Sequence, residues 1–246
     1  MRRRILLCGV PILIACNSVL GIDPPTVPPD AGADANVDGG GADAGCAVDQ
    51  DPCIPFPQCG CGDLNCEVTA SDGTTSCSAV TSTPLYANCV GYGSCPKGAE
   101  CIGGVCKPFC ASAADCTGGY RTCEQITSTG KNGGPPVPAL KVCSSGCDPI
   151  APLAVCGPDV ACFPWPFDGK KKDFGDCFGK VGKGVGPGAC SGTNQSDCAP
   201  GYYCTQAGDC TQWCRVGHPE DCTTGTCVPF IDVPVSIAGV PYGICL

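Results

Sequence analysis

Residues 190–214 read CSGTNQSDCAPGYYCTQAGDCTQWC and contain five cysteines in 25 positions. They begin a series of eight cysteines, separated by 7, 5, 5, 3, 7, 4 and 17 residues: Cys190, Cys198, Cys204, Cys210, Cys214, Cys222, Cys227 and Cys245. An earlier series has intervals of 5, 5, 4, 3, 5, 6 and 19 residues: Cys89, Cys95, Cys101, Cys106, Cys110, Cys116, Cys123 and Cys143. Such self-similarity predicts two tandem modules. We expect one disulfide pairing pattern in both series and no bridge between them.

A smaller motif, C-x5–7-C-x4–6-C, occurs four times within these series, with Cys95, Cys116, Cys198 and Cys222 in the middle. The residue before each middle cysteine has a short polar side chain, and the third residue after it is glycine: Ser94 and Gly98, Asp115 and Gly119, Asp197 and Gly201, Asp221 and Gly225. Asp and Ser bind nearby backbone amides, and glycine adopts positive φ without steric cost. Each motif therefore predicts a small turn or hairpin held by cysteines.

The other cysteines divide into two further even groups. Six lie before the first series (Cys46, Cys53, Cys59, Cys61, Cys66, Cys77), and four lie between the two series (Cys147, Cys156, Cys162, Cys177). Even groups in an exported chain predict a disulfide framework. Cys59 and Cys61 are separated by one glycine, so we expect each to pair with a different partner.

The N-terminus has the features of an export signal. Three arginines at 2–4 precede an apolar run, 5–15, that ends before Cys16 and is too short to span a bilayer. This arrangement resembles the bacterial lipobox, which implies lipidation of Cys16. Each acyl CH₂ buried in a membrane contributes ~0.8 kcal/mol, so two or three chains on Cys16 would form a durable anchor. An ordinary secretion signal that happens to contain a cysteine is the alternative.

Residues 17–45 contain five aspartates, four prolines and no lysine or arginine. A segment so poor in apolar residues cannot offset its ordering entropy, which predicts a disordered acidic tether. Asp34, Asn36 and Asp38 match the first half of a calcium loop, but its twelfth position is Gly45 instead of a bidentate glutamate. We therefore expect no metal and no cofactor.

The composition favours a small disulfide-rich fold: tandem cysteine-rich modules with short β-hairpins and irregular loops, and almost no helix after the signal peptide. Leu, Ile, Val and Phe make up 35 of the 201 residues in 46–246, too few for one large core. Disulfides would replace that core. We expect strands near 140–143 and 233–237, with Pro234 and Pro241 confining strands to sheet edges. The expected segments are a signal peptide (1–15), a lipidated tether (16–45), a six-cysteine region (46–88), a first repeat (89–143), a connecting region (144–189) and a second repeat (190–246).

Several kinds of chemistry are not supported. The chain has no C-x-x-C motif, which disfavours zinc ribbons and thioredoxin-like redox activity. Its one histidine, His218, lies beside glycine and proline and is expected in a solvated loop. The net charge of −9 argues against nucleic acid as a partner. We therefore expect no enzyme activity.

One segment has an unusual composition. Aromatic residues and lysines gather between Cys162 and Cys177, and we consider six of them a candidate binding loop: Phe163, Trp165, Phe167, Lys170, Lys171 and Lys172. Rigid aromatic rings and cations on a loop can form a recognition surface for a protein or a polysaccharide. In the alternative interpretation, the aromatic rings form a local core with solvated lysines around it.

Two resemblances complete this picture. Cys190, Asp197-Cys198, Tyr203-Cys204 and Cys210-x3-Cys214 resemble the N-terminal cysteine-rich module of Dickkopf-type secreted proteins, without that module's adjacent cysteine pair. The whole layout resembles cysteine-rich lipoproteins of myxobacterial type, which implies a surface protein. We expect a lipid-anchored extracytoplasmic protein, in the outer membrane or at the cell surface, that acts as a structural, adhesive or binding module. An inhibitor or ligand-binding module with a disulfide-constrained loop is the alternative.

Overall fold

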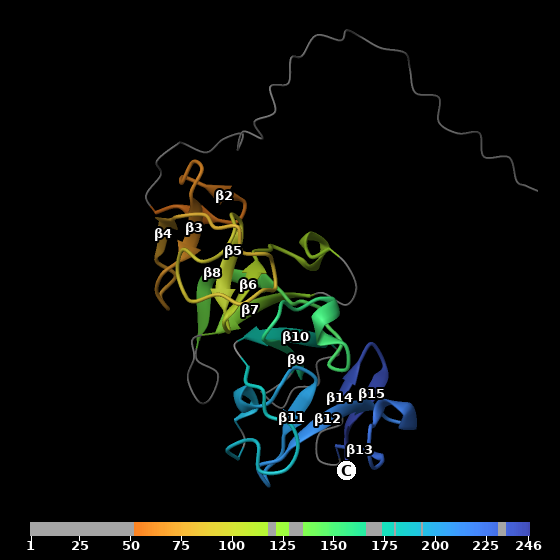
Figure 1. Ribbon diagram of the computed structural model, residues 1–246. Helices are drawn as coiled ribbons and strands as arrows, with labels where there is room; N and C mark the ends of the chain where they lie inside the picture. The colour runs from red at the N-terminus through yellow and green to blue at the C-terminus, as the bar shows by residue number, and fades with distance from the viewer. Residues whose placement is uncertain are drawn as a thin grey trace, which may run out of the picture. The chain divides into compact units, whose positions relative to one another are not determined.

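Antiparallel β-hairpins are the building blocks of this protein. The computed structural model describes residues 52–117, 122–127, 135–165, 174–179, 181–192, 194–230 and 235–246. Five two-stranded sheets come first along the chain (Figure 1): β1 (Ile54–Pro55) with β2 (Gln58–Cys59), β3 (Asn65–Val68) with β4 (Thr75–Ser78), β5 (Ala99–Ile102) with β6 (Val105–Pro108), β7 (Cys123–Thr127) with β8 (Pro136–Cys143), and β9 (Val160–Trp165) with β10 (Phe174–Gly179). The expected strand near Leu140 is confirmed as part of β8.

The C-terminal residues form a five-stranded sheet. Its order is β11 (Tyr202–Cys204), β12 (Cys210–Arg215), β15 (Val240–Cys245) and β13 (Cys227–Pro229), and β14 (Val235–Ile237) also pairs with β15. The expectation that Pro241 lies only in an edge strand is wrong, because β15 is an inner strand. Pro241 is near its start, where its carbonyl accepts the Val216 N–H at 2.9 Å. Val233 and Pro234 lie outside the described residues.

Helical structure in the described ranges consists of four short 3₁₀ turns: η1 (Ala113–Asp115), η2 (Pro152–Ala154), η3 (Gln195–Asp197) and η4 (Pro219–Asp221). This agrees with the expected strand-dominated, disulfide-rich fold. Within the part of the chain that the structure describes, no helix has the length and apolarity needed to cross a membrane.

Twelve disulfides join described cysteines, with Cα–Cα distances from 5.4 to 6.0 Å. Cys59 is also disulfide-bonded, and its neighbour Cys61 pairs with Cys77, so the two pair separately as expected. The pairs in the two eight-cysteine series match one for one, and none joins one series to the other. The expectation of a shared pairing pattern is confirmed.

The pairing defines a four-cysteine unit in which the first cysteine bonds the third and the second bonds the fourth. Six groups have this order: unit 1 (Cys53, Cys61, Cys66, Cys77), unit 2 (Cys89, Cys95, Cys101, Cys106), unit 3 (Cys110, Cys116, Cys123, Cys143), unit 4 (Cys147, Cys156, Cys162, Cys177), unit 5 (Cys190, Cys198, Cys204, Cys210) and unit 6 (Cys214, Cys222, Cys227, Cys245). In every unit the third and fourth cysteines lie directly opposite each other on two paired strands. Two disulfides thus join each pair of strands to the segment that precedes it.

A hydrogen bond recurs inside four of these units. The residue after the first cysteine donates its backbone N–H to the side chain of the residue before the second cysteine. The pairs are Val90 to Ser94 (3.2 Å), Ala111 to Asp115 (3.0 Å), Ser191 to Asp197 (2.8 Å) and Arg215 to Asp221 (2.9 Å). Gly98, Gly201 and Gly225 have the expected positive φ, from 79° to 88°, and Gly119 lies outside the described residues. The predicted turn role is confirmed for the described residues and stays a prediction for Gly119.

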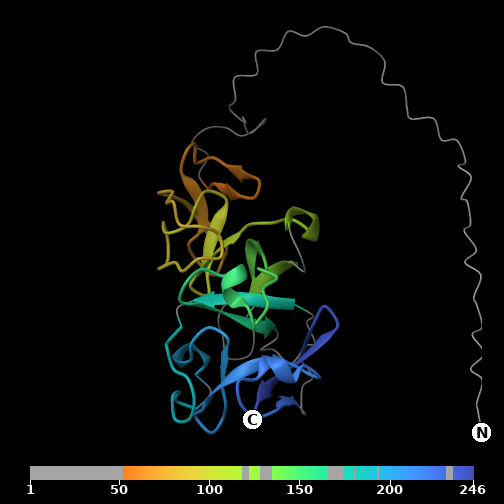
Figure 2. The same ribbon diagram turned by 45° about the vertical axis from the view of Figure 1, so that its right-hand side comes forward.

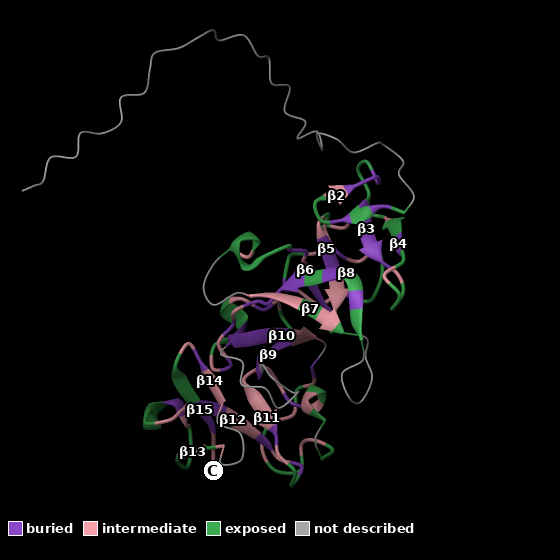
Figure 3. Ribbon diagram, turned by 180° about the vertical axis from the view of Figure 1, so that it is seen from behind, coloured by how far each residue is buried: buried purple, intermediate pink, exposed green. Residues whose placement is uncertain are grey.

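Apolar burial is divided among several small clusters. One centres on Val105, Tyr86 and Val160, another on Phe163, Trp213 and Tyr242, and a third on Val68, Leu140 and Val142. Buried residues lie mainly on strands such as β5, β6 and β10, while loops are largely exposed (Figure 3). Because each cluster is small, the disulfides supply restraints that a large core would otherwise provide.

Direct contacts join neighbouring units within the described, compact part of the chain. The β5–β6 turn consists of Gly103 and Gly104, both at positive φ, as two-residue hairpin turns require. This turn lies against β10: Gly179 donates its N–H to the Gly103 carbonyl at 3.1 Å, and a Cβ at Gly103 would lie 2.8 Å from the Phe178 ring. The turned view in Figure 2 shows β9–β10 between the hairpins that precede it and the C-terminal sheet.

Candidate functional site

The predicted binding loop is only partly within the described residues. Trp165 ends β9, where its backbone is in register with Phe174. Phe167, Lys170, Lys171 and Lys172 lie outside the described residues. The interpretation as a binding loop therefore stays a prediction for these four residues.

Phe163 has a different place from the one predicted. Its side chain is 4% exposed and lies in a cluster with Val181 and Trp213. Its ring centroid is 6.3 Å from that of Phe178, with the two planes tilted by 51°. The residues of β9 from Val160 to Phe163 are all buried, so both faces of this strand are covered. Phe163 is a core residue, as in the alternative interpretation of this segment.

A more exposed apolar segment lies between Cys89 and Cys95, the first two cysteines of unit 2. Val90 is 91% exposed and Tyr92 is 60% exposed. The glycines that follow them, Gly91 and Gly93, have φ of 88° and 67°, so the segment turns back on itself. We call residues 90–94 the unit 2 loop.

Several contacts fix the unit 2 loop. Val90 donates its N–H to Ser94 Oγ at 3.2 Å, and the Ser94 hydroxyl donates to the Gly91 carbonyl. Two further bonds attach the loop to unit 1: Gly93 N–H to Glu67 Oε2 (2.9 Å) and Tyr92 O–H to the Thr69 carbonyl (2.6 Å). The bridges Cys89–Cys101 and Cys95–Cys106 hold its two ends. Exposed apolar side chains on a restrained loop lose little conformational entropy when they bind a partner.

The polar groups in units 4 and 6 form a structural network. Arg215 bonds Asp221 through two nitrogens, at 2.7 and 2.8 Å, which lowers the pKa of Asp221. Tyr242 donates its O–H to Asp148 at 3.1 Å, and burial, followed by the charge of Asp148, raises the pKa of the phenol. These groups bond one another and stabilise local turns.

His218 lies in an exposed turn, as predicted for a solvated loop histidine. Its Nδ1 is 2.8 Å from a carboxylate oxygen of Glu220, and both side chains are exposed. The sequence offers no second histidine for a catalytic pair with it. Its contact with Glu220 accounts for the lowered pKa of that carboxyl.

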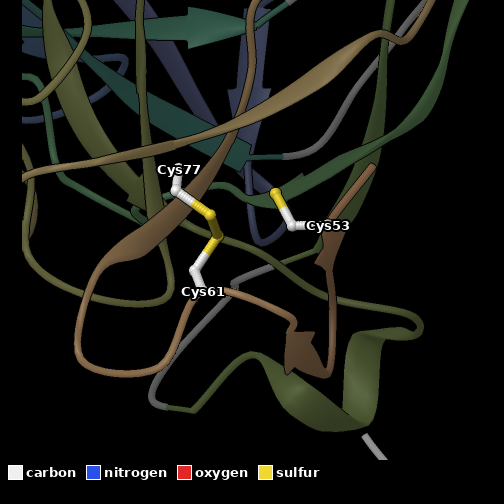
Figure 4. Close-up of side chains that lie close together, drawn as sticks. All are labelled: Cys53, Cys61 and Cys77. Atoms are coloured by element: carbon white, nitrogen blue, oxygen red, sulfur yellow. A yellow bond between two sulfur atoms is a disulfide. The ribbon is translucent and has the colours of Figure 1, made fainter. Parts of the chain in front are cut away.

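Clusters of sulfur atoms could be mistaken for metal sites. In one, atoms of Cys53, Cys61 and Cys77 lie within 4.8 Å of one another. Figure 4 shows that Cys61 and Cys77 are bonded to each other, and Cys53 is bonded to Cys66. Four further groups of this kind, in units 2 to 5, likewise consist of disulfide cysteines. A sulfur in a disulfide is not the thiolate that zinc binds.

Comparison with known proteins does not assign this chain to a family. No family model, no curated protein and no solved structure matches this chain.

The unit 2 loop was not singled out from the sequence, although a local signal exists. Residues 89–95 read CVGYGSC, in which two apolar residues alternate with glycines between closely spaced cysteines. Such a loop is too short and too glycine-rich to bury both side chains within itself. The corresponding positions are Ala111 and Ala113 in unit 3, Ser191 and Thr193 in unit 5, and Arg215 and Gly217 in unit 6, so the unit 2 loop alone has two large apolar side chains there.

Proposed function

We propose that this protein is an extracytoplasmic, lipid-anchored contact module without catalytic activity. The observation that carries the proposal is oxidation: every described cysteine is in a disulfide. Disulfides at this density are typical of proteins in oxidising compartments. The basic and apolar leader that ends at Cys16 supports an anchor at the membrane surface.

The anchor can be tested at Cys16. Cys16→Ser removes the sulfur that would carry the lipid, so we expect the protein to move from the membrane fraction to the soluble fraction. Cys8→Ser is the matched control, because Cys8 lies in the segment expected to be removed. Unchanged membrane association and unchanged incorporation of labelled palmitate in Cys16→Ser would contradict lipid anchoring.

Two surfaces are candidates for the contact. The unit 2 loop presents Val90 and Tyr92, and the segment between Cys162 and Cys177 contains Trp165 and Lys170–Lys172. We expect V90S/Y92S, or alanine substitution of Trp165 and Lys170–Lys172, to reduce binding of the soluble protein to cell-envelope polysaccharide or envelope protein. V185S is the control, because Val185 is an exposed apolar residue in a different loop. Unchanged binding in both variants would contradict both surfaces.

A constrained-loop inhibitor is the second candidate function. The restraint of the unit 2 loop by two bridges and the exposure of Tyr92 favour it. An inhibitor of this kind would slow a protease that cleaves after aromatic residues, and Tyr92→Ser would abolish the inhibition. Rapid cleavage of the wild-type loop without inhibition would reject this function.

A further inference from the structure

Units 1 and 2 exchange buried hydrogen bonds through two glutamates. Glu67 on β3 of unit 1 accepts the N–H of Gly93 in unit 2 at 2.9 Å. Glu100 on β5 of unit 2 accepts the N–H of Val68 in unit 1 at 2.8 Å. The two residues are 1% and 3% exposed. Each unit thus supplies a carboxyl group that accepts a backbone N–H of the other unit. We call this contact the β3–β5 joint.

A buried amide completes the β3–β5 joint. The Asn65 side chain donates to Glu67 Oε1 at 3.1 Å and to the Ala99 carbonyl at 2.8 Å. Its oxygen accepts the Gly98 N–H at 3.0 Å and the Gln58 amide at 2.7 Å. Every one of these donors is neutral. Two carboxylates buried in such surroundings would repel each other without a compensating cation.

The ionisable groups around the joint have other partners. Among the described residues, no lysine, arginine or histidine forms an ion pair with Glu67 or Glu100. Lys107 is opposite Glu100 in register but bonds Asp176, and Lys97 donates to the Gly62 carbonyl. Three further ionisable groups lie on adjoining elements. Asp72 bonds Thr74, and Tyr92 bonds the Thr69 carbonyl. Lys141 on β8 is exposed.

Burial favours the protonated form of the Glu100 carboxyl. Burial is the largest cause of a Glu100 pKa raised to about 8. The N–H of Val68 acts against it, the charge of Glu67 acts with it, and the N–H of Cys101 acts against it. The unfolded value is near 4.5. Because the folded pKa is raised, the joint is most stable below pH 4.5, and its stability falls as the pH rises towards 8.

We propose that the β3–β5 joint is a proton-dependent latch, closed while Glu100 carries a proton and loosened when Glu100 is ionised. Glu67 holds the unit 2 loop through Gly93, so loosening also releases one restraint on Val90 and Tyr92. Any effect on binding rests on the proposed function, whereas opening of the joint does not.

Hydrogen exchange in the full-length soluble protein tests the latch at pH 6 and pH 9, after correction for intrinsic exchange rates. We expect at least tenfold faster exchange at pH 9 for the amides of Val68 and Gly93, with little change in unit 6. Glu100→Gln retains an acceptor for Val68 without the titrating proton, so its exchange should not differ between the two pH values. Glu220→Gln, at an exposed carboxylate, is the control and should behave as wild type.

A titration of the wild-type protein makes the test independent of any variant. The carboxyl carbon resonance of Glu100 should titrate near pH 8, whereas that of Glu220 should titrate below its ordinary range because of the contact with His218. Titration of Glu100 near 4.5, equal protection of Val68 and Gly93 at both pH values, or loss of protection throughout the chain would overturn the proposal. A pH-dependent joint with no effect of V90S/Y92S on binding would leave the latch intact and reject only the proposed function of the loop.

Discussion

Lys107 on β6 and Asp176 on β10 form a buried ion pair that joins unit 2 to unit 4. The ammonium also lies 4.9 Å from the centre of the Phe178 ring. Asp176 has two further donors, the N–H groups of Ser145 at 2.9 Å and Cys177 at 3.0 Å. The carboxylate therefore neutralises the Lys107 ammonium and accepts hydrogen bonds from two backbone N–H groups.

This arrangement predicts unequal effects at the two ends of the pair. Asp176→Ala leaves a buried ammonium and two backbone N–H groups without their acceptor, so it should lower the free energy of unfolding by about 3–5 kcal/mol. Lys107→Met leaves the carboxylate with two hydrogen bonds and should cost less. Urea unfolding under non-reducing conditions measures both. A larger loss for Lys107→Met would show that the amides contribute little.

In unit 6, the hydrogen bond from the backbone of Arg215 to Asp221 lies in the loop between the first two cysteines. It predicts that acid lowers the stability of the protein. Arg215 lowers the pKa of Asp221, so the stabilising contribution is present above the ordinary value of 3.8 and is lost as the pH falls through the lower folded value. Asp221→Ala should cost about 1–3 kcal/mol at pH 7, because it removes a hydrogen-bonded partner of Arg215. It should also remove part of the acid dependence seen by thermal unfolding between pH 5 and 2. An unchanged acid profile would contradict this assignment.

Gly175 on β10 should tolerate no side chain. A Cβ there would collide with the Cys147 carbonyl and lie 2.9 Å from Cys162 Sγ, and both neighbours belong to a disulfide. Gly175→Ala should therefore lower the melting temperature strongly. Gly186→Ala is the comparison: its Cβ would meet open space at φ 79°, and only the backbone strain of about 1–2 kcal/mol should appear. Equal losses in the two variants would reject the steric explanation.

Each unit closes its own disulfides, so we expect the loss of one disulfide to leave the pairing in the other units unchanged. Removing Cys214–Cys227 by C214A/C227A should cost about 2–5 kcal/mol and leave the bridges of units 1 to 5 as in the wild type. Proteolysis and mass spectrometry without reduction would identify the pairs. New pairs between units in this variant would contradict independent closure.

The partner of Cys59 is a further prediction. The six-cysteine region is expected to close its own bridges, and two of them use Cys53, Cys61, Cys66 and Cys77. We therefore expect a Cys46–Cys59 disulfide, which the same peptide mapping would detect. A peptide that links Cys59 to any other cysteine would disprove it.

Local features of this fold could be predicted from sequence because they depend on neighbouring residues. Asp115, Asp197 and Asp221 bind backbone amides within six residues, and Gly201 adopts the positive φ that its turn needs. Matching cysteine intervals were sufficient to predict a shared pairing pattern. The common order of units 1 and 4 was not predicted, because their spacing differs from that of the repeats.

Contacts between units could not be predicted in this way. Glu67 and Glu100 are 33 positions apart, and Lys107 and Asp176 are 69 positions apart. From the sequence, these ionisable side chains would be expected on the surface. They are buried only because one hairpin packs on another. Phe163 was misplaced for the same reason, since the Trp213 cluster that covers it comes from a different unit.

The pairing order also affects how this protein can reach its native state. A chain emerges from the ribosome or a translocation channel with its N-terminus first. Four cysteines allow three pairings and eight allow 105, so closing each unit as it emerges replaces one very large search by a succession of three-way choices. Errors can be corrected within one hairpin before the next cysteine arrives. Oxidative folding can thus proceed in the direction of synthesis, and the work left to a disulfide isomerase does not multiply as units are added.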